Sequence, residues 1–173
     1  MNIKKTVEKA FNEQINAETY SAYLYWSMAA WCDRNNLPGF ANWMRVQVQE
    51  EMSHAVKFYT YLIDRGGAVK LAAIAGPETE WKDIEAIFAA TLKHENYITD
   101  LINGLVDLTT KEKDHAGTQF LQWFVNEQVE EEKNADQILG QLKVMGKQPG
   151  AALYMLDKEM AARVFVPPTA QAT

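Results

Sequence analysis

The sequence has few of the features that would staple the chain together or anchor it in a membrane. It contains a single cysteine, Cys32, so neither an intrachain disulfide nor a two-cysteine metal knuckle can form. No apolar run is long enough to span a bilayer, and the N-terminal residues lack the apolar core of a signal peptide. We therefore expect a cytoplasmic protein with no membrane partner.

Positive charge is also scarce. Seventeen lysine and arginine residues stand against 23 aspartate and glutamate residues, which gives a net charge of -6. Sequence-independent binding of nucleic acid needs a basic face, so this balance argues against a nucleic-acid partner. An acidic surface suits cation traffic, although it most often serves solubility. Apolar residues make up 47% of the 173 residues, which fits one globular domain with a sizeable core.

Proline and glycine, with five and nine residues, are concentrated between long stretches of helical periodicity. Apolar residues recur three and four positions apart in those stretches, and no alternating run is typical of a strand. The pattern predicts helices over about 6–34, 39–65, 82–111, 115–146 and 151–164.

The lengths of the connections predict the topology. Tight turns make the first and second long helices antiparallel neighbours, and likewise the third and fourth. The middle connection of roughly sixteen residues can extend about 50 Å, whereas a helix of about 26 residues is only about 39 Å long. The predicted fold is thus an all-α four-helix bundle with one long crossover plus a short fifth C-terminal helix. It occupies residues 1–165, followed by a tail at 166–173.

Acidic residues interrupt each apolar stripe near the middle of its helix. They are Glu18, Glu51 with His54, Glu95, and Glu131 with Gln128. Helix middles meet at the same height in such a bundle, so four carboxylates and an imidazole should share one core layer. A buried carboxylate without a partner costs several kcal/mol, and no lysine or arginine lies on these stripes at that height. Two iron ions would balance four carboxylates, and carboxylate with imidazole suits non-haem iron.

Each of these signals is weak alone. A single glutamate on a stripe is more often a rim residue, and a Glu-x-x-His pair such as Glu51 and His54 is common on solvated faces. Four helices that each place an acid at mid-height are a much rarer coincidence, which disfavours a metal-free structural bundle. A di-iron oxygenase or peroxidase that uses the same layer on another substrate stays open as the alternative.

A second acidic group lies beside this layer and consists of Glu50, Glu127 and Glu130. It could form another metal site, although a solvated acidic face explains a run of charges equally well. Tyr25 lies two turns after Glu18 on the same helix face, within reach of the layer. Core packing is the ordinary role of a single aromatic residue at such a position.

Four stretches of the sequence closely resemble the bacterial non-haem ferritins: residues 12–18 (NEQINAE), 49–54 (QEEMSH), 93–95 (KHE) and 120–128 (FLQWFVNEQ). The resemblance covers nearly the whole chain and implies a ferritin-like fold. It also implies a ferroxidase that oxidises Fe(II) with O2 or H2O2 and stores the product as ferric mineral. The partners implied are further copies of the chain, twenty-four in all, in a hollow shell with the short fifth helix at the four-fold axes.

The resemblance assigns roles to the residues that match its motifs. The ligands of a first iron are matched by Glu18, Glu51 and His54. Those of a second iron are matched by Glu51, Glu95 and Glu131, so that Glu51 bridges the two irons. Gln128 matches a residue that lies next to the ligands without binding iron. Glu50, Glu127 and Glu130, together with Glu131, match a third iron site. Tyr25 and Trp123 match aromatic residues that supply electrons during oxygen reduction.

Comparison with related families qualifies these roles. Glu131 stands where bacterioferritins carry a second Glu-x-x-His histidine. Met52 stands where they place a haem-binding methionine, yet many non-haem ferritins share it, so haem is an alternative that is not favoured. Thr118 and Leu121 replace the acids that line the three-fold iron channels of animal ferritins, which leaves the path of iron into the shell open. The single cysteine excludes the extra iron module of a rubrerythrin.

Large aromatic residues also lie outside the apolar stripes, at Trp26, Trp31, Tyr59, Trp81 and Tyr97. So many exposed rings are unusual on a monomer. We expect them to be buried between subunits.

Overall fold

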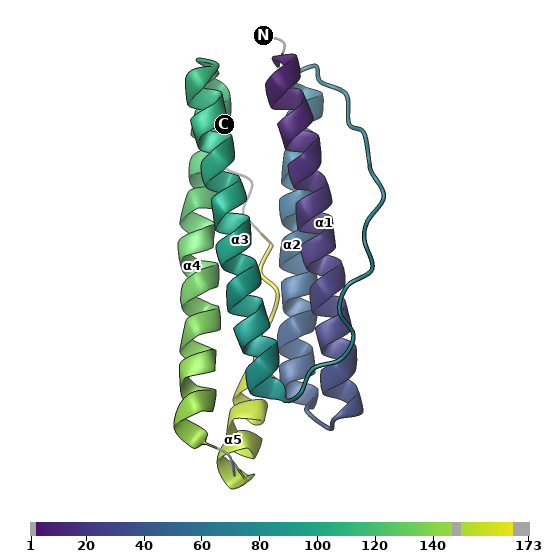
Figure 1. The fold of residues 1–173 in the computed structure, drawn as a ribbon, viewed down its shortest axis with the longest axis vertical. Coiled ribbons are helices and arrows are strands. Elements are labelled where there is room, and N and C mark those ends of the chain that lie inside the picture. The colour runs from purple at the N-terminus through teal and green to yellow at the C-terminus, as the bar shows by residue number, and fades with distance from the viewer. Residues whose placement is uncertain (1–2, 147–149, 168–173) are drawn as a thin grey trace.

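Five α-helices make up most of the computed structural model, which describes residues 3–146 and 150–167 (Figure 1). They are α1 (Lys5–Arg34), α2 (Pro38–Asp64), α3 (Ile84–Lys111), α4 (His115–Met145) and α5 (Gly150–Met160). The described residues contain no strand, so the all-α prediction is confirmed. The predicted break at 147–149 and residues 168–173 of the predicted tail lie outside the described residues. Helix α5 ends at Met160, earlier than the predicted 164.

Two tight turns join the helix pairs as predicted. Asn36 adopts a left-handed conformation (φ 58°) between α1 and α2, and Lys113 does the same (φ 55°) between α3 and α4. Asp114 then caps α4, because its carboxylate accepts a hydrogen bond from the Gly117 amide at 3.2 Å. The same carboxylate pairs with Arg65 at 2.9 Å, which ties this turn to the end of α2.

The connection between α2 and α3 runs the length of the bundle beside α1 (Figure 1). Side chains of α1 hold its backbone carbonyls in ascending order: Asn12 donates to Ala68 at 2.9 Å, Asn16 to Ala73 at 3.1 Å and Ser27 to Glu78 at 2.7 Å. Because both sets of residue numbers rise together, the connection is parallel to α1. Helices α2 and α3 therefore run in the same direction, and the predicted long crossover is confirmed.

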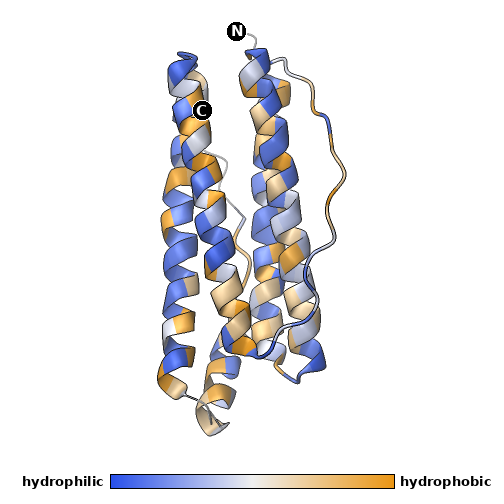
Figure 2. Cartoon of the chain, viewed as in Figure 1, coloured by the Kyte–Doolittle hydropathy of each residue, from blue (hydrophilic) through white to orange (hydrophobic). Residues whose placement is uncertain are grey.

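The apolar core is divided into two clusters. The cluster at the α5 end contains Met28, Phe40 and Phe88, and the one at the opposite end contains Phe58 and Phe124, whose rings stack at 4.3 Å. The level between the two clusters holds buried polar side chains instead. Figure 2 shows the corresponding hydrophilic stretch in the middle of α4. The two clusters thus hold the helices together on either side of a polar layer.

The aromatic residues outside the apolar stripes differ in exposure. Trp26, Tyr59 and Tyr97 are 64%, 46% and 53% exposed on the single subunit. Trp31 lies in the cluster at the α5 end, and Trp81 packs partly buried against it. The expectation that Trp31 needs a neighbouring subunit to bury it is therefore wrong, because its own bundle already covers it. Among the described residues, no helix is long and apolar enough to cross a membrane.

Helix α5 docks against the start of α2. The Phe40 amide donates to the Asp157 carboxylate at 3.0 Å, which satisfies one of the free amides at the N-terminus of α2. Gly39 permits this close approach, because a Cβ atom there would lie 1.6 Å from the Asp157 carbonyl oxygen. The absence of a side chain at residue 39 therefore fixes the position of α5.

This contact gives a prediction for Gly39→Ala. The added methyl group should push α5 off α2, at a cost of about 1–2 kcal/mol for the lost cap and packing. Amide hydrogen exchange over residues 150–160, followed by mass spectrometry, should become about tenfold faster. Gly104→Ala is the matched control, because its added methyl group would meet open space. Unchanged exchange in Gly39→Ala would contradict the docking role.

Candidate metal centre

The middle level of the bundle collects four carboxylates and one imidazole from all four long helices. Each of the five side chains is only 1–6% exposed: Glu18 on α1, Glu51 and His54 on α2, Glu95 on α3 and Glu131 on α4. The helices place them at a common height because each acid lies near its helix centre and neighbouring helices overlap along their lengths. We call these five residues the central layer.

Two groups of ligand atoms are close enough to share a metal ion. Atoms of Glu18, Glu51 and His54 lie within 4.8 Å of one another, and so do atoms of His54, Glu127 and Glu131. His54 Nδ1 is 3.5 Å from a Glu51 carboxylate oxygen, as expected for residues three apart on one helix face. The His54 ring meets Trp123 edge to face at a centroid distance of 5.4 Å, which restricts its rotation.

Three glutamine side chains orient the carboxylates. Gln14 donates to Glu18 at 2.9 Å, Gln47 donates to Glu131 at 2.9 Å, and Gln128 donates to Glu95 at 3.2 Å. Gln128 was identified from the sequence, whereas the contacts of Gln14 and Gln47 were missed. A signal for both existed, since Gln14 precedes Glu18 by one turn and Gln47 precedes Glu51 by one turn on their stripes.

The carboxylates of the central layer lack enough partners within the protein. One buried oxygen of Glu18 and one of Glu51 make no hydrogen bond, and neither does the Gln47 amide oxygen. In the described part of the chain, no lysine or arginine forms an ion pair with any of the four acids. The layer is thus rich in acceptors and has no cation of its own.

Burial changes the protonation chemistry of these acids. Desolvation raises the pKa of Glu18, and desolvation together with the charges of its acidic neighbours holds the pKa of Glu51 far above its usual range. Desolvation and the charge of Glu131 raise the pKa of Glu95 to about 8. Bound cations would reverse these effects, because they stabilise the charged form of each carboxylate.

Tyr25 lies at the edge of the central layer. Its side chain is fully buried, and its hydroxyl donates a hydrogen bond to Glu95. Burial raises the pKa of Tyr25 well above its usual value, so the phenol stays protonated and can donate. His94 packs edge to face against Tyr25 at 6.0 Å, and burial lowers the pKa of His94 to about 4, which leaves that imidazole neutral.

The second acidic group is less uniform than the sequence suggested. Glu127 is half-buried and turns toward His54 and Glu131, whereas Glu130 is exposed. Glu50 is half-buried and forms an ion pair with Arg163 at 2.5 Å. Desolvation raises the pKa of Glu50 to about 7, and the charges of Glu131, Glu127 and Glu130 act in the same direction. These acids are therefore near enough to influence one another.

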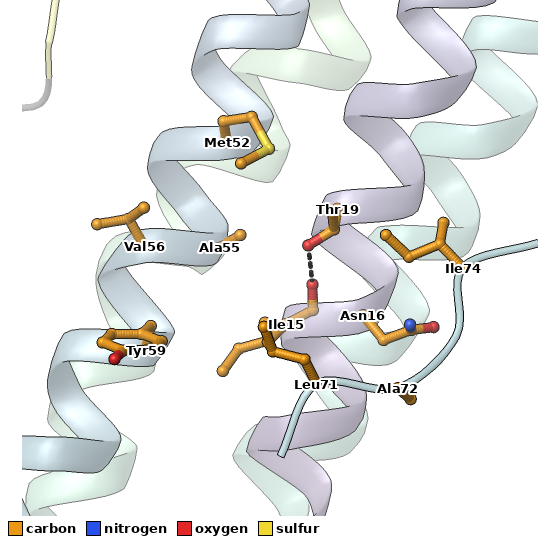
Figure 3. Close-up of a pocket in the computed structure, with 10 residues that line it drawn as sticks. All are labelled: Ile15, Asn16, Thr19, Met52, Ala55, Val56, Tyr59, Leu71, Ala72 and Ile74. Atoms are coloured by element: carbon orange, nitrogen blue, oxygen red, sulfur yellow. Dashed lines mark hydrogen bonds between the residues drawn. The ribbon is translucent and has the colours of Figure 1, made fainter. Parts of the chain in front are cut away.

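Met52 lies away from the central layer. It is 43% exposed and lines an apolar pocket of about 210 Å³ between α1, α2 and the crossover (Figure 3). The lining of this pocket includes none of the residues of the central layer.

The positions that differ from animal ferritins offer no acid. Leu121 is fully buried in the core cluster opposite α5, and the Thr118 hydroxyl bonds to Thr109 at 3.0 Å. Neither side chain can replace a carboxylate in a cation channel.

Comparisons with known proteins agree with this geometry. Residues 8–145 match the ferritin-like domain family. A probable bacterial non-heme ferritin-like protein of Haemophilus influenzae is 40% identical over 91% of this chain and 95% of its own length. The bacterial non-heme ferritin of Staphylococcus saprophyticus is 41% identical over 94% of this chain and 97% of its own.

Solved structures extend the likeness to three dimensions. A closed form of the Archaeoglobus fulgidus ferritin, engineered by site-directed mutagenesis, is 48% identical and superposes with a TM-score of 0.94. The match covers 95% of this chain and 100% of that one. With the family match, relatives of similar length and a bundle of the same shape, this chain belongs to the ferritin family, in its bacterial non-haem branch.

Proposed function

We propose that this chain is an iron-storage ferritin, which oxidises Fe(II) in the central layer with O2 or H2O2 and keeps the product as ferric mineral inside a hollow shell. The observation that carries this proposal is that one buried carboxylate oxygen of Glu18 and one of Glu51 have no hydrogen-bond partner. Family membership supports iron as the cation. The iron is substrate and cargo here, and the protein supplies its ligands.

We infer two iron positions in the central layer. Glu18, Glu51 and His54 would hold the first, and Glu95, Glu131 and Glu51 the second, so that Glu51 bridges the two. The hydrogen bonds from Gln14, Gln47 and Gln128 fix the carboxylates before iron arrives. Such outer hydrogen bonds reduce the reorganisation needed when metal binds.

The chemistry needs two irons side by side. Each Fe(II) gives up one electron, and O2 takes two electrons and two protons to become H2O2. With H2O2 as the oxidant, two electrons and two protons give two water molecules. Carboxylates prefer Fe(III), the harder cation, so the ligand set favours oxidation. Tyr25 can supply a further electron to the oxidant, and its phenolic proton would then pass to Glu95, which accepts its hydrogen bond.

A third iron would bind beside the central layer, at Glu50, Glu127 and Glu130 with Glu131. Glu127 supports this position, because it already lies with His54 and Glu131 and so adjoins both groups. This position has carboxylates as its own ligands and is more open to solvent. We therefore expect it to hold iron more weakly than the central layer.

We further propose that twenty-four copies assemble into the shell. The large rings of Trp26, Tyr59 and Tyr97 are exposed on the single subunit. Tyr59 also lines the apolar pocket of Figure 3. Exposed apolar surface of this kind is typical of subunit interfaces. A second copy of the chain is the partner that would cover it.

The alternative is a di-iron enzyme that oxidises an organic substrate. Such an enzyme needs a substrate pocket that opens onto the metal layer, whereas the apolar pocket of Figure 3 is lined by none of the five central residues. Electron microscopy after aerobic loading with Fe(II) distinguishes the two functions. Storage gives electron-dense cores inside shells, and a soluble enzyme gives none.

Glu51→Gln tests the central layer. The amide keeps the shape of the side chain but loses the bridging charge, so rapid Fe(II) oxidation should slow by about a hundredfold or more. The iron-free protein should unfold at the same temperature or higher, because an unpaired buried acid is removed. Stopped-flow absorbance and calorimetry measure the two effects. Glu85→Gln, at an exposed position of α3, should leave both unchanged, and rapid oxidation in Glu51→Gln would exclude the proposed site.

Glu130→Gln tests the division between central and third positions. The first rapid turnover should proceed at the rate of the original protein, since Glu130 is exposed and outside the central layer. Later turnovers should change in rate or in oxygen consumed per iron. Oxygen uptake recorded in parallel with absorbance checks this expectation. Loss of the first phase would show that Glu130 belongs to the primary chemistry instead.

Val56→Asp tests the assembly. Val56 is 56% exposed in the subunit and lines the apolar pocket, so the substitution should leave the bundle folded. A carboxylate buried there between two copies costs several kcal/mol, and the shell should dissociate into smaller species in sedimentation velocity. Val56→Thr has nearly the same shape without the charge and should still assemble. An intact Val56→Asp shell would mean that this face is not an interface.

A further inference from the structure

The chain after α5 turns back along α2 (Figure 1). Asn42 on α2 holds this return, because its side-chain amide donates to the Arg163 carbonyl at 3.0 Å. The Arg163 guanidinium lies over the Trp43 ring at 4.3 Å, a cation–π distance. Two consecutive residues of α2 therefore fix both the backbone and the side chain of Arg163.

From this position Arg163 reaches the acidic group. Its Nη2 atom is 2.5 Å from a Glu50 carboxylate oxygen, and the two side chains are 20% and 22% exposed. The ion pairs Arg34–Glu80 and Arg45–Asp33 are far more open, with every side chain at least 45% exposed. The Arg163–Glu50 pair is thus partly shielded from water, where an ion pair is stronger than at the surface.

The surroundings of Glu50 make this pair unusual. Glu131, Glu127 and Glu130 are the acidic neighbours of Glu50, whereas Arg163 is the basic side chain that contacts it. Arg163 therefore supplies positive charge to the acidic group, whereas no lysine or arginine among the described residues pairs with the central layer. One carboxylate oxygen of Glu50 is already taken by a guanidinium fixed to Trp43.

We propose that Arg163 is a built-in competitor of the third iron. A cation at Glu50, Glu127 and Glu130 must share Glu50 with a guanidinium of the same sign, and the resulting repulsion weakens its binding. Tight binding there requires Arg163 to leave Glu50, which loosens the segment held on Asn42 and Trp43. The returning segment thus acts as a latch on the third site. This inference rests on the third site proposed above.

Coupling of this kind works in both directions. If the latch weakens binding of the third ion, the third ion must weaken the latch by the same factor. The central layer should be unaffected, because its ligands make no contact with Arg163. Iron would then fill the two central positions first and reach the third only by displacing the C-terminal segment.

Binding of Zn(II) to iron-free shells, followed by calorimetry, tests the competition without any oxidation. Two Zn(II) per subunit should bind tightly and a third more weakly. In Arg163→Gln the third should bind about five- to tenfold more tightly, the effect of losing one partly shielded ion pair, with the first two within about twofold. Arg163→Lys keeps the charge and should fall between. Arg45→Gln removes the Arg45–Asp33 pair (2.7 Å) elsewhere on α2 and should change nothing.

Hydrogen exchange of the original protein gives a second readout that needs no substitution at Arg163. Exchange over residues 161–167 should rise on addition of the third equivalent of Zn(II) and stay unchanged over the first two. Unchanged affinity in Arg163→Gln, or unchanged exchange at the third equivalent, overturns the latch.

Glu130→Gln separates this failure from failure of the third site itself. A third Zn(II) that Glu130→Gln weakens, but Arg163→Gln leaves alone, retains the site and removes the latch. Absence of a third Zn(II) from both the original protein and Arg163→Gln removes both, while two tight ions would still support the central layer. A third ion that appears only in Arg163→Gln supports the strongest form of the latch.

Discussion

The rest of this fold depends on four carboxylates that are buried in the middle of an apolar core. Desolvation raises the pKa of Glu18, Glu51 and Glu95, and no lysine or arginine in the described part of the chain forms an ion pair with them. A layer of this kind contributes little to stability without a bound cation. Stability must come from the two apolar clusters on either side. Long helices are the consequence, since each must carry an apolar stripe above and below its acid.

Those features that depend on a single helix could be predicted from the sequence. The height of Glu95 on α3 follows from counting residues, and the direction of α3 follows from the length of the crossover. Pairings between helices could not be predicted, because they depend on how far each helix is rotated about its axis. The bond from Gln47 to Glu131 and the one from Tyr25 to Glu95 are of this kind. Trp31 lies outside the predicted apolar stripe of α1, yet it is buried within its own bundle, because the buried face of α1 is wider than that stripe.

The position of the C-terminal segment could not be predicted from the helical periodicity of the sequence. The sequence pattern continues past Met160, yet α5 ends there and the chain returns along α2. Arg163 thereby meets Glu50, a residue 113 positions earlier. No spacing rule links such distant residues. They meet because α5 docks on α2, where Gly39 allows the close approach and the Phe40 amide bonds to Asp157 of α5. The close approach allowed by one glycine thus decides which basic residue reaches the acidic group.

The partners that the protein provides for its carboxylates increase from the centre of the bundle outward. This difference should make iron bind tightly at the centre and leave more readily from the outer positions. At the centre, Glu51 pairs with no lysine or arginine and has one oxygen without a hydrogen bond, so a metal ion is its best partner. Next to it, Glu50 forms an ion pair with Arg163, and further out Glu130 is exposed to solvent. A cation should bind most tightly to the carboxylates that have the fewest hydrogen bonds and ion pairs within the protein. Iron should be held firmly where two ions must react together and loosely where the product must move on, because a position that held every ion equally tightly could not pass iron to a growing mineral.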